Sequence, residues 1–335
     1  MKKGVLILTL IAVPLLTHAE GLAAVLRSAR EVNETYLELQ VDAELAELRY
    51  EKARIEARDQ IAVLTAESTY LGAQADHLRS LQSFYAEVVD ATYGAVIAEH
   101  DRQIAERNEE LARNEEAAME VRFRNGLVPE GDLIDTRIAV RSAAVEREER
   151  SWQFSDALDA LADATGRTLA EIALPAPPSF SSPMNADEWV AADPGVARAR
   201  IAQEIAEVRL TRLPSNAPEF DRMALETELE RARLATDRAI NASERAYESL
   251  ERRLTTLPQI LTIRTEQLQL NDALHREAQE RFDRGLITAA QRDQTFTRVL
   301  TARRNLIDSQ RNYVRVVLEY AALAGIDPEE VLDHT

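Results

Sequence analysis

Two long stretches of this sequence repeat apolar residues every three or four positions, and they constrain the fold most. They cover about residues 75–124 and 219–284, where Ala, Leu, Val and Ile recur among Glu, Arg and Gln. This spacing predicts amphipathic α-helices built from strong helix formers. Helices of about 50 to 65 residues would be about 75–100 Å long. Because a lone helix of that length is marginal, we expect its apolar stripe to be buried in long antiparallel, coiled-coil-like helical hairpins.

Turn-forming residues are scarce, which also favours an all-α fold. The 335 residues include only 10 Gly and 11 Pro, fewer than a typical globular chain contains. Few turns are therefore expected. One break is PSNAP at residues 214–218, and the corresponding break in the first half is expected within residues 55–72.

The sequence contains two copies of one repeated unit. RFRNGL at residues 122–127 matches RFDRGL at residues 281–286 with an offset of 159, and the same offset relates Gly166 to Gly325. Upstream, ELAELRY matches EIAEVRL with an offset of 160. Three matches in nearly one register predict an internal duplication. In both hexapeptides the glycine suits the left-handed end of a helix, and Thr288 can cap the helix that follows.

The two halves are joined by a segment rich in proline and serine. LPAPPSFSSP at residues 174–183 holds four prolines and three serines, which favours an extended connector. The predicted organisation is a signal peptide at 1–19, a first helical repeat at 20–173, a connector at 174–186, a second helical repeat at 187–326 and a C-terminal tail at 327–335. Trp152 and Trp189 lie in sequence near the connector, and we expect both to be packing anchors there.

The N-terminus has the pattern of a secretory signal. Lys2 and Lys3 precede an apolar run at residues 4–16, and the small residues Thr17 and Ala19 follow it. The run covers about 20 Å, less than the ~30 Å hydrocarbon core of a bilayer. A retained anchor is the alternative, since bilayers can thin around short spans. We expect cleavage after Ala19, an exported protein located in the periplasm or associated with the outer membrane, and no membrane span in the mature chain.

Charge and motif content exclude several classes of function. The formal net charge is -18, which disfavours binding to nucleic acid. There is no cysteine, so thiolate metal sites and thiol catalysis are excluded. No Glu-x-x-His motif of a di-iron bundle is present, and no phosphate loop or catalytic elbow. We expect no enzyme activity, no metal and no cofactor.

The duplicated layout resembles the TolC family of outer-membrane efflux and secretion channels. In that family each long helix ends in a pattern like R-[FY]-x-x-G-[LIV]-x-x-x-x-D. Residues Arg122, Phe123, Gly126, Leu127 and Asp132 reproduce the pattern in the first half, and Arg281, Phe282, Gly285 and Leu286 reproduce most of it in the second. The resemblance implies a passive conduit in a tripartite efflux or type I secretion system. It also implies a homotrimer whose partners are a periplasmic adaptor and an inner-membrane transporter.

The sequence departs from the family at the places where membrane strands would be inserted. A membrane strand needs about 9–11 residues of alternating polarity. PSNAP is too short for two strands, and Ile61–Ala62–Val63–Leu64 is equally typical of a helix. We therefore expect a TolC-like helical protomer without a substantial β-barrel.

The resemblance also identifies candidate site residues at the two tips. Those expected to dock an adaptor hairpin are Gly126, Leu127, Val128, Gly285, Leu286 and Ile287. Those at the possible aperture are Asp132, Asp135, Gln291 and Gln294; the acidic pair is present only in the first half, and for these aspartates stabilisation of the helix N-terminus is an equal alternative. A periplasmic coiled-coil spacer or chaperone-like protein without transport activity is the alternative function. Oligomeric state distinguishes the two, because a conduit must be an oligomer.

Overall fold

The computed structural model describes residues 21–333, with gaps at 173, 175–176 and 178–179. The expected signal peptide therefore lies outside the described residues. Within the described part of the chain the regular structure is helical and no β-strand occurs, which confirms the all-α expectation. The helices are α1 Leu22–Val32, α2 Glu34–Glu56, α3 Gln60–Arg124, α4 Glu130–Thr165, the short η1 Leu169–Glu171, α5 Ala186–Ala192, α6 Pro194–Thr211, α7 Glu219–Asp283, α8 Ala289–Ala324 and α9 Pro328–Asp333.

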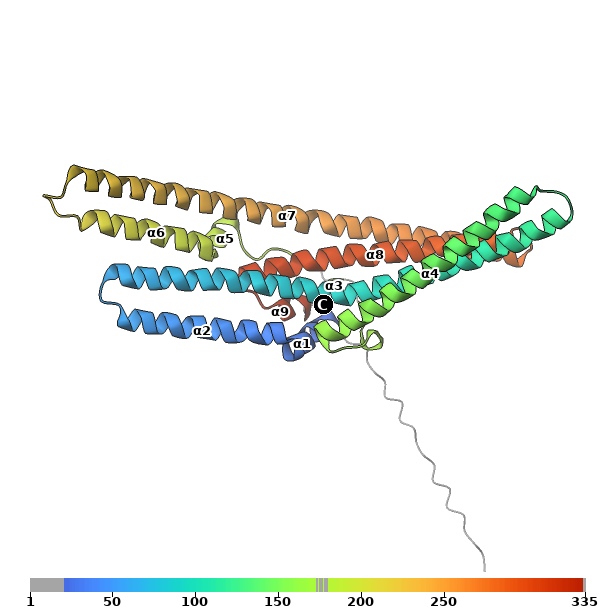
Figure 1. Cartoon of the computed structure of the whole chain (residues 1–335), viewed down its shortest axis with the longest axis horizontal. Helices are drawn as coiled ribbons and strands as arrows, with labels where there is room; N and C mark the ends of the chain where they lie inside the picture. The colour runs from blue at the N-terminus through green and yellow to red at the C-terminus, as the bar shows by residue number, and fades with distance from the viewer. Residues whose placement is uncertain (1–20, 173, 175–176, 178–179, 334–335) are drawn as a thin grey trace, which may run out of the picture.

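The long helices lie side by side in an elongated rod (Figure 1). Toward the end where α3 turns into α4 and α7 turns into α8, called here the turn end, the order across the rod is α4, α3, α8, α7. Toward the opposite end, called the loop end, the order is α2, α3, α6, α7. Because the helices form a layer rather than a closed bundle, α2 and α4 form one edge of it and α7 forms the other.

The breaks between helices fall where the turn formers or caps lie. The break expected within residues 55–72 is at residues 57–59, and the Asp59 side chain accepts a hydrogen bond of 2.8 Å from the Ala62 N–H at the start of α3. PSNAP lies in the loop between α6 and α7. Pro258 lies inside α7, which continues through it as one helix.

The main apolar core lies at the middle of the rod. The buried face of α1, including Val25 and Leu26, packs against α3 residues such as Val88 and against Leu318 of α8. Arg30 of α1 lies 2.9 Å from a carboxylate oxygen of Glu329 in α9, so the first and last helices are tied together. The two halves of the chain therefore meet around one central cluster.

The two tryptophans have different environments. Trp189 is 6% exposed and packs with Tyr320 and Leu250 beside the described connector residues, as expected for an anchor. Trp152 is 63% exposed on α4, so the expectation that it packs at the connector is wrong. Its position in the sequence is near the connector, but the helical rotation of α4 turns its side chain away from α3.

Candidate functional site

Both tip turns have the same backbone geometry. The Leu127 N–H donates to the Arg122 carbonyl at 3.0 Å, and the Leu286 N–H donates to the Arg281 carbonyl at 2.8 Å. Such bonds cap the carbonyl end of a helix and require a residue in the left-handed region before the leucine. Gly126 supplies it with φ 68° and Gly285 with φ 72°. The sequence patterns RNGL and RGL therefore fold into equivalent turns.

The structure brings the expected docking residues to one end of the rod (Figure 1). Leu127 is 72% exposed and Leu286 is 66% exposed, whereas Val128 and Ile287 are partly buried. No described part of the chain covers the two leucines. Each tip therefore presents one outward leucine supported by a second apolar residue.

The four expected aperture residues have different roles. Gln291 closes a capping box: its N–H donates to Thr288 Oγ1 at 3.2 Å, and its Oε1 accepts from the Thr288 N–H at 3.0 Å. Asp132 lies in the first turn of α4, where a carboxylate favours the helix dipole. Asp135 and Gln294 are exposed. Gln291 thus acts as a helix cap, and the other three side chains form no described cluster.

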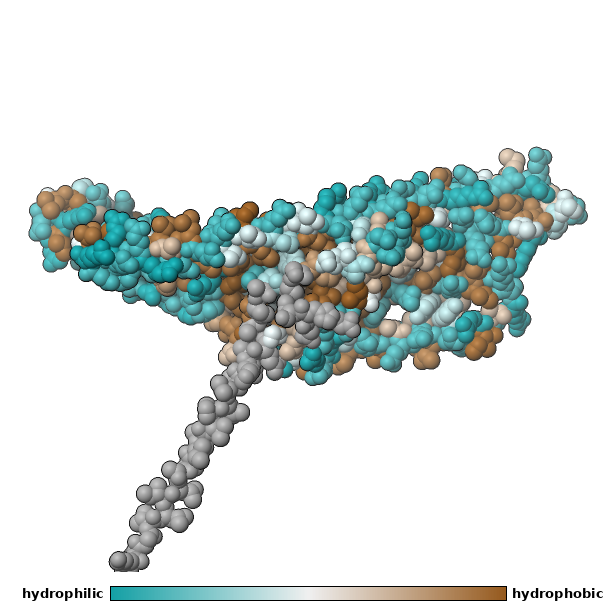
Figure 2. All heavy atoms as spheres, turned by 180° about the vertical axis from the view of Figure 1, so that it is seen from behind, coloured by the Kyte–Doolittle hydropathy of each residue, from teal (hydrophilic) through white to brown (hydrophobic). Residues whose placement is uncertain are grey.

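The outward sides of the edge helices carry exposed apolar residues that the sequence alone did not single out. On α4, Ile134, Ile138, Val145 and Trp152 are 47–66% exposed, while Leu133 and Leu161 on the side toward α3 are buried. Because most of these positions are seven residues apart, they form one stripe along the helix. Figure 2 shows hydrophobic residues interrupting the polar surface along the rod.

The other edge helices have the same pattern. The exposed large apolar residues of α2 are Leu37, Val41, Leu45, Leu48 and Ile55, and those of α7 are Phe220, Met223, Leu234, Ile263, Leu270 and Leu274. The spacing of seven in the sequence was the available signal. It predicts burial of the stripes against partner helices, but the sequence does not say which stripe has its partner in the same chain.

Contacts across the layer fix which parts of the two edges lie at the same height along the rod. Arg147 of α4 lies 2.7 Å from buried Glu109 of α3, and Arg107 of α3 lies over the Phe296 ring of α8 at 5.5 Å. The Phe296 and His275 rings, from α8 and α7, are 5.2 Å apart. Arg147 is therefore level with His275, so the neighbouring Val145 and Trp152 on α4 lie near the heights of Leu274 and Leu270 on α7.

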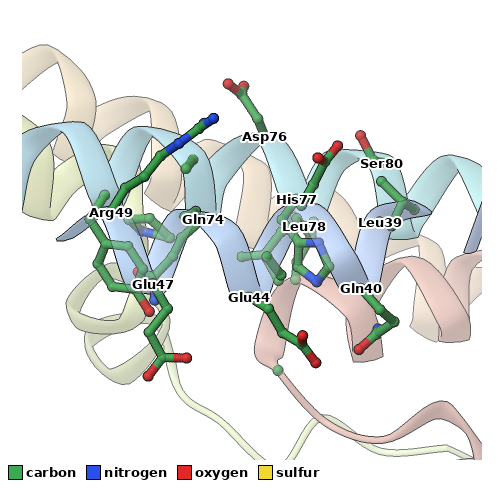
Figure 3. Close-up of a pocket in the computed structure, with 18 of the residues that line it drawn as sticks. Leu39, Gln40, Glu44, Glu47, Arg49, Gln74, Asp76, His77, Leu78 and Ser80 are labelled. Carbon is green, nitrogen blue, oxygen red and sulfur yellow. The ribbon is translucent and has the colours of Figure 1, made fainter. Parts of the chain in front are cut away.

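A hollow of about 720 Å³ lies beside α2 and α3, with contributions from the ends of α6 and α8 (Figure 3). Figure 3 shows His77 lying between α2 and α3, while Asp76, Glu44 and Glu47 point outward. Burial lowers the pKa of His77, and its Nδ1 has no hydrogen-bond partner. The charged side chains do not converge, and the described residues contain no group of three side chains suited to hold a metal ion.

Solved structures similar to this chain are bacterial channel and membrane proteins. The Campylobacter jejuni CmeC outer membrane channel shares 14% identity with a TM-score of 0.55, over 90% of this chain and 85% of that one. The open Neisseria gonorrhoeae MtrE outer membrane channel shares 15% identity with a TM-score of 0.55, over 90% and 88%. A membrane protein from Pseudomonas aeruginosa shares 14% identity with a TM-score of 0.58, over 90% of each chain. The fold is that of the TolC-like outer-membrane channels.

The TolC-like fold is established by structure rather than by sequence similarity. No protein-family model matches the chain, and no curated protein sequence matches it. Among the described residues of this TolC-like chain, no helix is both long enough and apolar enough to cross a lipid bilayer.

Proposed function

We propose that this chain is the channel component of a tripartite efflux or type I secretion system and acts as a passive conduit. In this proposal it is exported through the signal peptide at residues 1–19 and works in the periplasm as a homotrimer. The observation that carries the proposal is the pair of apolar stripes on opposite edges of the helical layer. Neither stripe has a partner within the described chain.

The two edges suit a ring better than a two-fold dimer. A two-fold contact through one edge would leave the stripe on the other edge uncovered, whereas contact between the α2 and α4 edge of one copy and the α7 edge of the next covers both. Head-to-tail contacts of this kind close into a ring when the rotation between copies is right. Burying two leucine-sized side chains per contact would contribute about 3–6 kcal/mol before association costs.

The turn end supplies the proposed docking site for a periplasmic adaptor, which would connect the conduit to an inner-membrane transporter. Leu127 and Leu286 project from the two turns, and Val128 and Ile287 lie behind them. Apolar side chains at helix-turn tips suit packing against another helical hairpin. In the proposed conduit the aperture is lined either by the neutral Gln294 or by the acidic pair Asp132 and Asp135.

The proposed duplication and segment boundaries are supported by matched element lengths. Helices α3 and α7 have 65 residues each, and α4 and α8 have 36 residues each. Gly166 and Gly325 end α4 and α8 with φ 65° and 67°. The proposed repeats at 20–173 and 187–326, joined by the connector at 174–186, would each supply one hairpin and its flanking helix to the wall.

The cysteine-free chain permits a direct test by cross-linking. Trp152→Cys and Leu270→Cys, introduced together, place one thiol on each edge at similar heights. Within one chain the two thiols are separated by α3 and α8, so a short bismaleimide can join only different copies. We expect a ladder of cross-linked species that stops at three chains.

The matched control pairs Trp152→Cys with the exposed Arg222→Cys at the loop end and should give no ladder. Monomers alone with the edge pair would contradict the conduit and favour a spacer.

A further inference from the structure

Three arginines lie in a row on the outward side of α7. Arg238, Arg245 and Arg252 are exposed and seven residues apart, so they share one side of the helix. This is the side of Leu234 and Ile263, so the row interrupts the apolar stripe at mid-length. Arg252 lies 3.9 Å from Glu248, and no carboxylate in the described part of the chain pairs with Arg238 or Arg245.

The opposite edge carries the opposite charge. Between Glu34 and Leu48, α2 has five carboxylates and no basic residue. All five side chains are exposed, and none forms an ion pair within the described residues; they are Glu34, Glu38, Asp42, Glu44 and Glu47. They flank the stripe formed by Leu37, Val41, Leu45 and Leu48. The edge is therefore both apolar and strongly acidic at this height.

Contacts across the middle of the rod place one end of each row at the same height. Arg253 of α7 lies 2.8 Å from Glu319 of α8, and Arg315 of α8 lies 3.2 Å from Asp90 of α3. The rings of Phe84 in α3 and Tyr36 in α2 are 5.0 Å apart. Arg252 is therefore level with the start of α2.

Contacts nearer the loop end align the other end of each row. Thr236 of α7 donates a hydrogen bond of 3.2 Å to the Ala199 carbonyl of α6. The Arg198 guanidinium of α6 packs against Gly72 of α3, and Tyr70 of α3 stacks on Tyr50 of α2 at 4.8 Å. Arg238 is therefore level with Leu48. The arginine row and the acidic segment thus span the same part of the rod.

Equal height matters because copies in a cyclic ring are related by rotation without a shift along the axis. We propose that Arg238, Arg245 and Arg252 of one copy pair with the α2 carboxylates of the next copy. The inference rests on the proposed ring and adds that ion pairs lie beside the apolar α2 stripe at the middle of each seam, which is the contact between two neighbouring copies. Such pairing fixes the register of the seam and makes assembly sensitive to salt.

Charge reversal in the chain lacking residues 1–19 tests the pairing. Light scattering at low and high salt measures how strongly each variant assembles. The arginine variant carries Arg238→Glu, Arg245→Glu and Arg252→Glu, and the acidic variant carries Glu38→Arg, Asp42→Arg and Glu44→Arg. Each variant alone should assemble at least about tenfold more weakly than the unmodified chain. An equimolar mixture of the two variants should form no homogeneous ring, because a ring of three always contains one contact between like copies. One chain carrying all six changes should recover assembly. The matched control reverses Arg58, Arg212 and Arg222, three exposed arginines at the loop end, and should assemble like the parent.

The outcomes separate this inference from the proposed function. A parent that assembles equally well at all salt concentrations, together with an unaffected arginine variant, overturns the pairing and leaves the ring intact. Weakening without recovery in the six-fold variant, or equal weakening in the control, also overturns the pairing. A parent that stays monomeric overturns both the pairing and the ring. Circular dichroism of each variant verifies that the exposed substitutions leave the helices folded.

Discussion

Gly126 and Gly285 end the two long helices in the same left-handed conformation, with φ 68° and 72°, at the same end of the rod. Each allows the following leucine N–H to cap the helix, and each leaves that leucine exposed. The identity of the two turns explains why the hexapeptide match in the sequence was informative. A glycine is needed there because other residues are strained at positive φ.

Glycine replacements should therefore cost stability in a predictable order. A Cβ at Gly126 would meet nothing within 4 Å, so Gly126→Ala should cost about 1 kcal/mol from backbone strain alone. At Gly166 a Cβ would also lie 3.1 Å from Val32 Cγ2, so Gly166→Ala should cost more. Urea unfolding measures both, and Gly131→Ala, inside α4 with open space and no positive φ, is the control that should lose no stability. Equal costs at Gly126 and Gly166 would contradict the role of the Val32 contact.

The buried carboxylate between α3 and α4 should depend on its partner across the helices. Glu109 is buried, with Arg113 at 2.6 Å and Arg147 at 2.7 Å. Arg147→Ala should lower the free energy of unfolding by about 1–2 kcal/mol, because Glu109 keeps one partner and Arg147 is partly exposed. Adding Glu109→Leu should restore part of the loss. An Arg147→Ala chain as stable as the parent would show that the pair contributes nothing.

Stability should fall as the pH falls through the range in which histidine titrates. Burial and the nearby Arg303 of α8 lower the pKa of His100 below 6.5, although Glu99 and Asp101 oppose the shift. The folded chain then binds fewer protons than the unfolded chain, so stability is full above pH 6.5 and is lost as pH falls toward the folded pKa. Burial also lowers the pKa of His77, so His77 adds to the loss of stability as the pH falls.

Thermal unfolding between about pH 7.5 and about pH 5 tests this sign. The parent should lose melting temperature on acidification, and His100→Asn should lose less. Changing both His100 and His77 to Asn should flatten the profile further. A His100→Asn profile as steep as that of the parent would mean that the pH dependence arises from other groups.

The edge stripes should be needed for assembly and not for folding. Val145→Ser with Leu270→Ser should leave the helical content unchanged, because both side chains are exposed in the single chain. The same pair should weaken association by roughly a hundredfold, given the apolar area removed from each contact. Sedimentation velocity reports the association, and Leu127→Ser with Leu286→Ser, equally exposed at the turn end, is the matched control. If association is unchanged in the edge variant, the stripes do not form the contact between copies.

Much of the fold could be predicted because helical periodicity and turn formers are local. The PSNAP break and the glycine turns follow directly from such residues. The break at residues 57–59 was harder to place because it contains neither glycine nor proline, and Asp59 alone signals it by capping α3. The start of α3 at Gln60, earlier than the expected stretch from about residue 75, follows from that cap.

The candidate site was less predictable because its residues lie on helices that are distant in the sequence. The sequence makes Gln291 an aperture candidate, yet its side chain closes a capping box with Thr288. Trp152 was assigned to the connector by its sequence position, whereas the rotation of α4 exposes it. The arginine row of α7 and the acids of α2 are 190 or more residues apart, and only the contacts through α3, α6 and α8 reveal their common height.

End-on electron microscopy of the purified chain lacking residues 1–19, with its mass measured by light scattering, tests the central claim most directly. We expect a particle of three chains with a central opening surrounded by helices. A single chain without an opening, at concentrations where the edges should associate, would contradict the account.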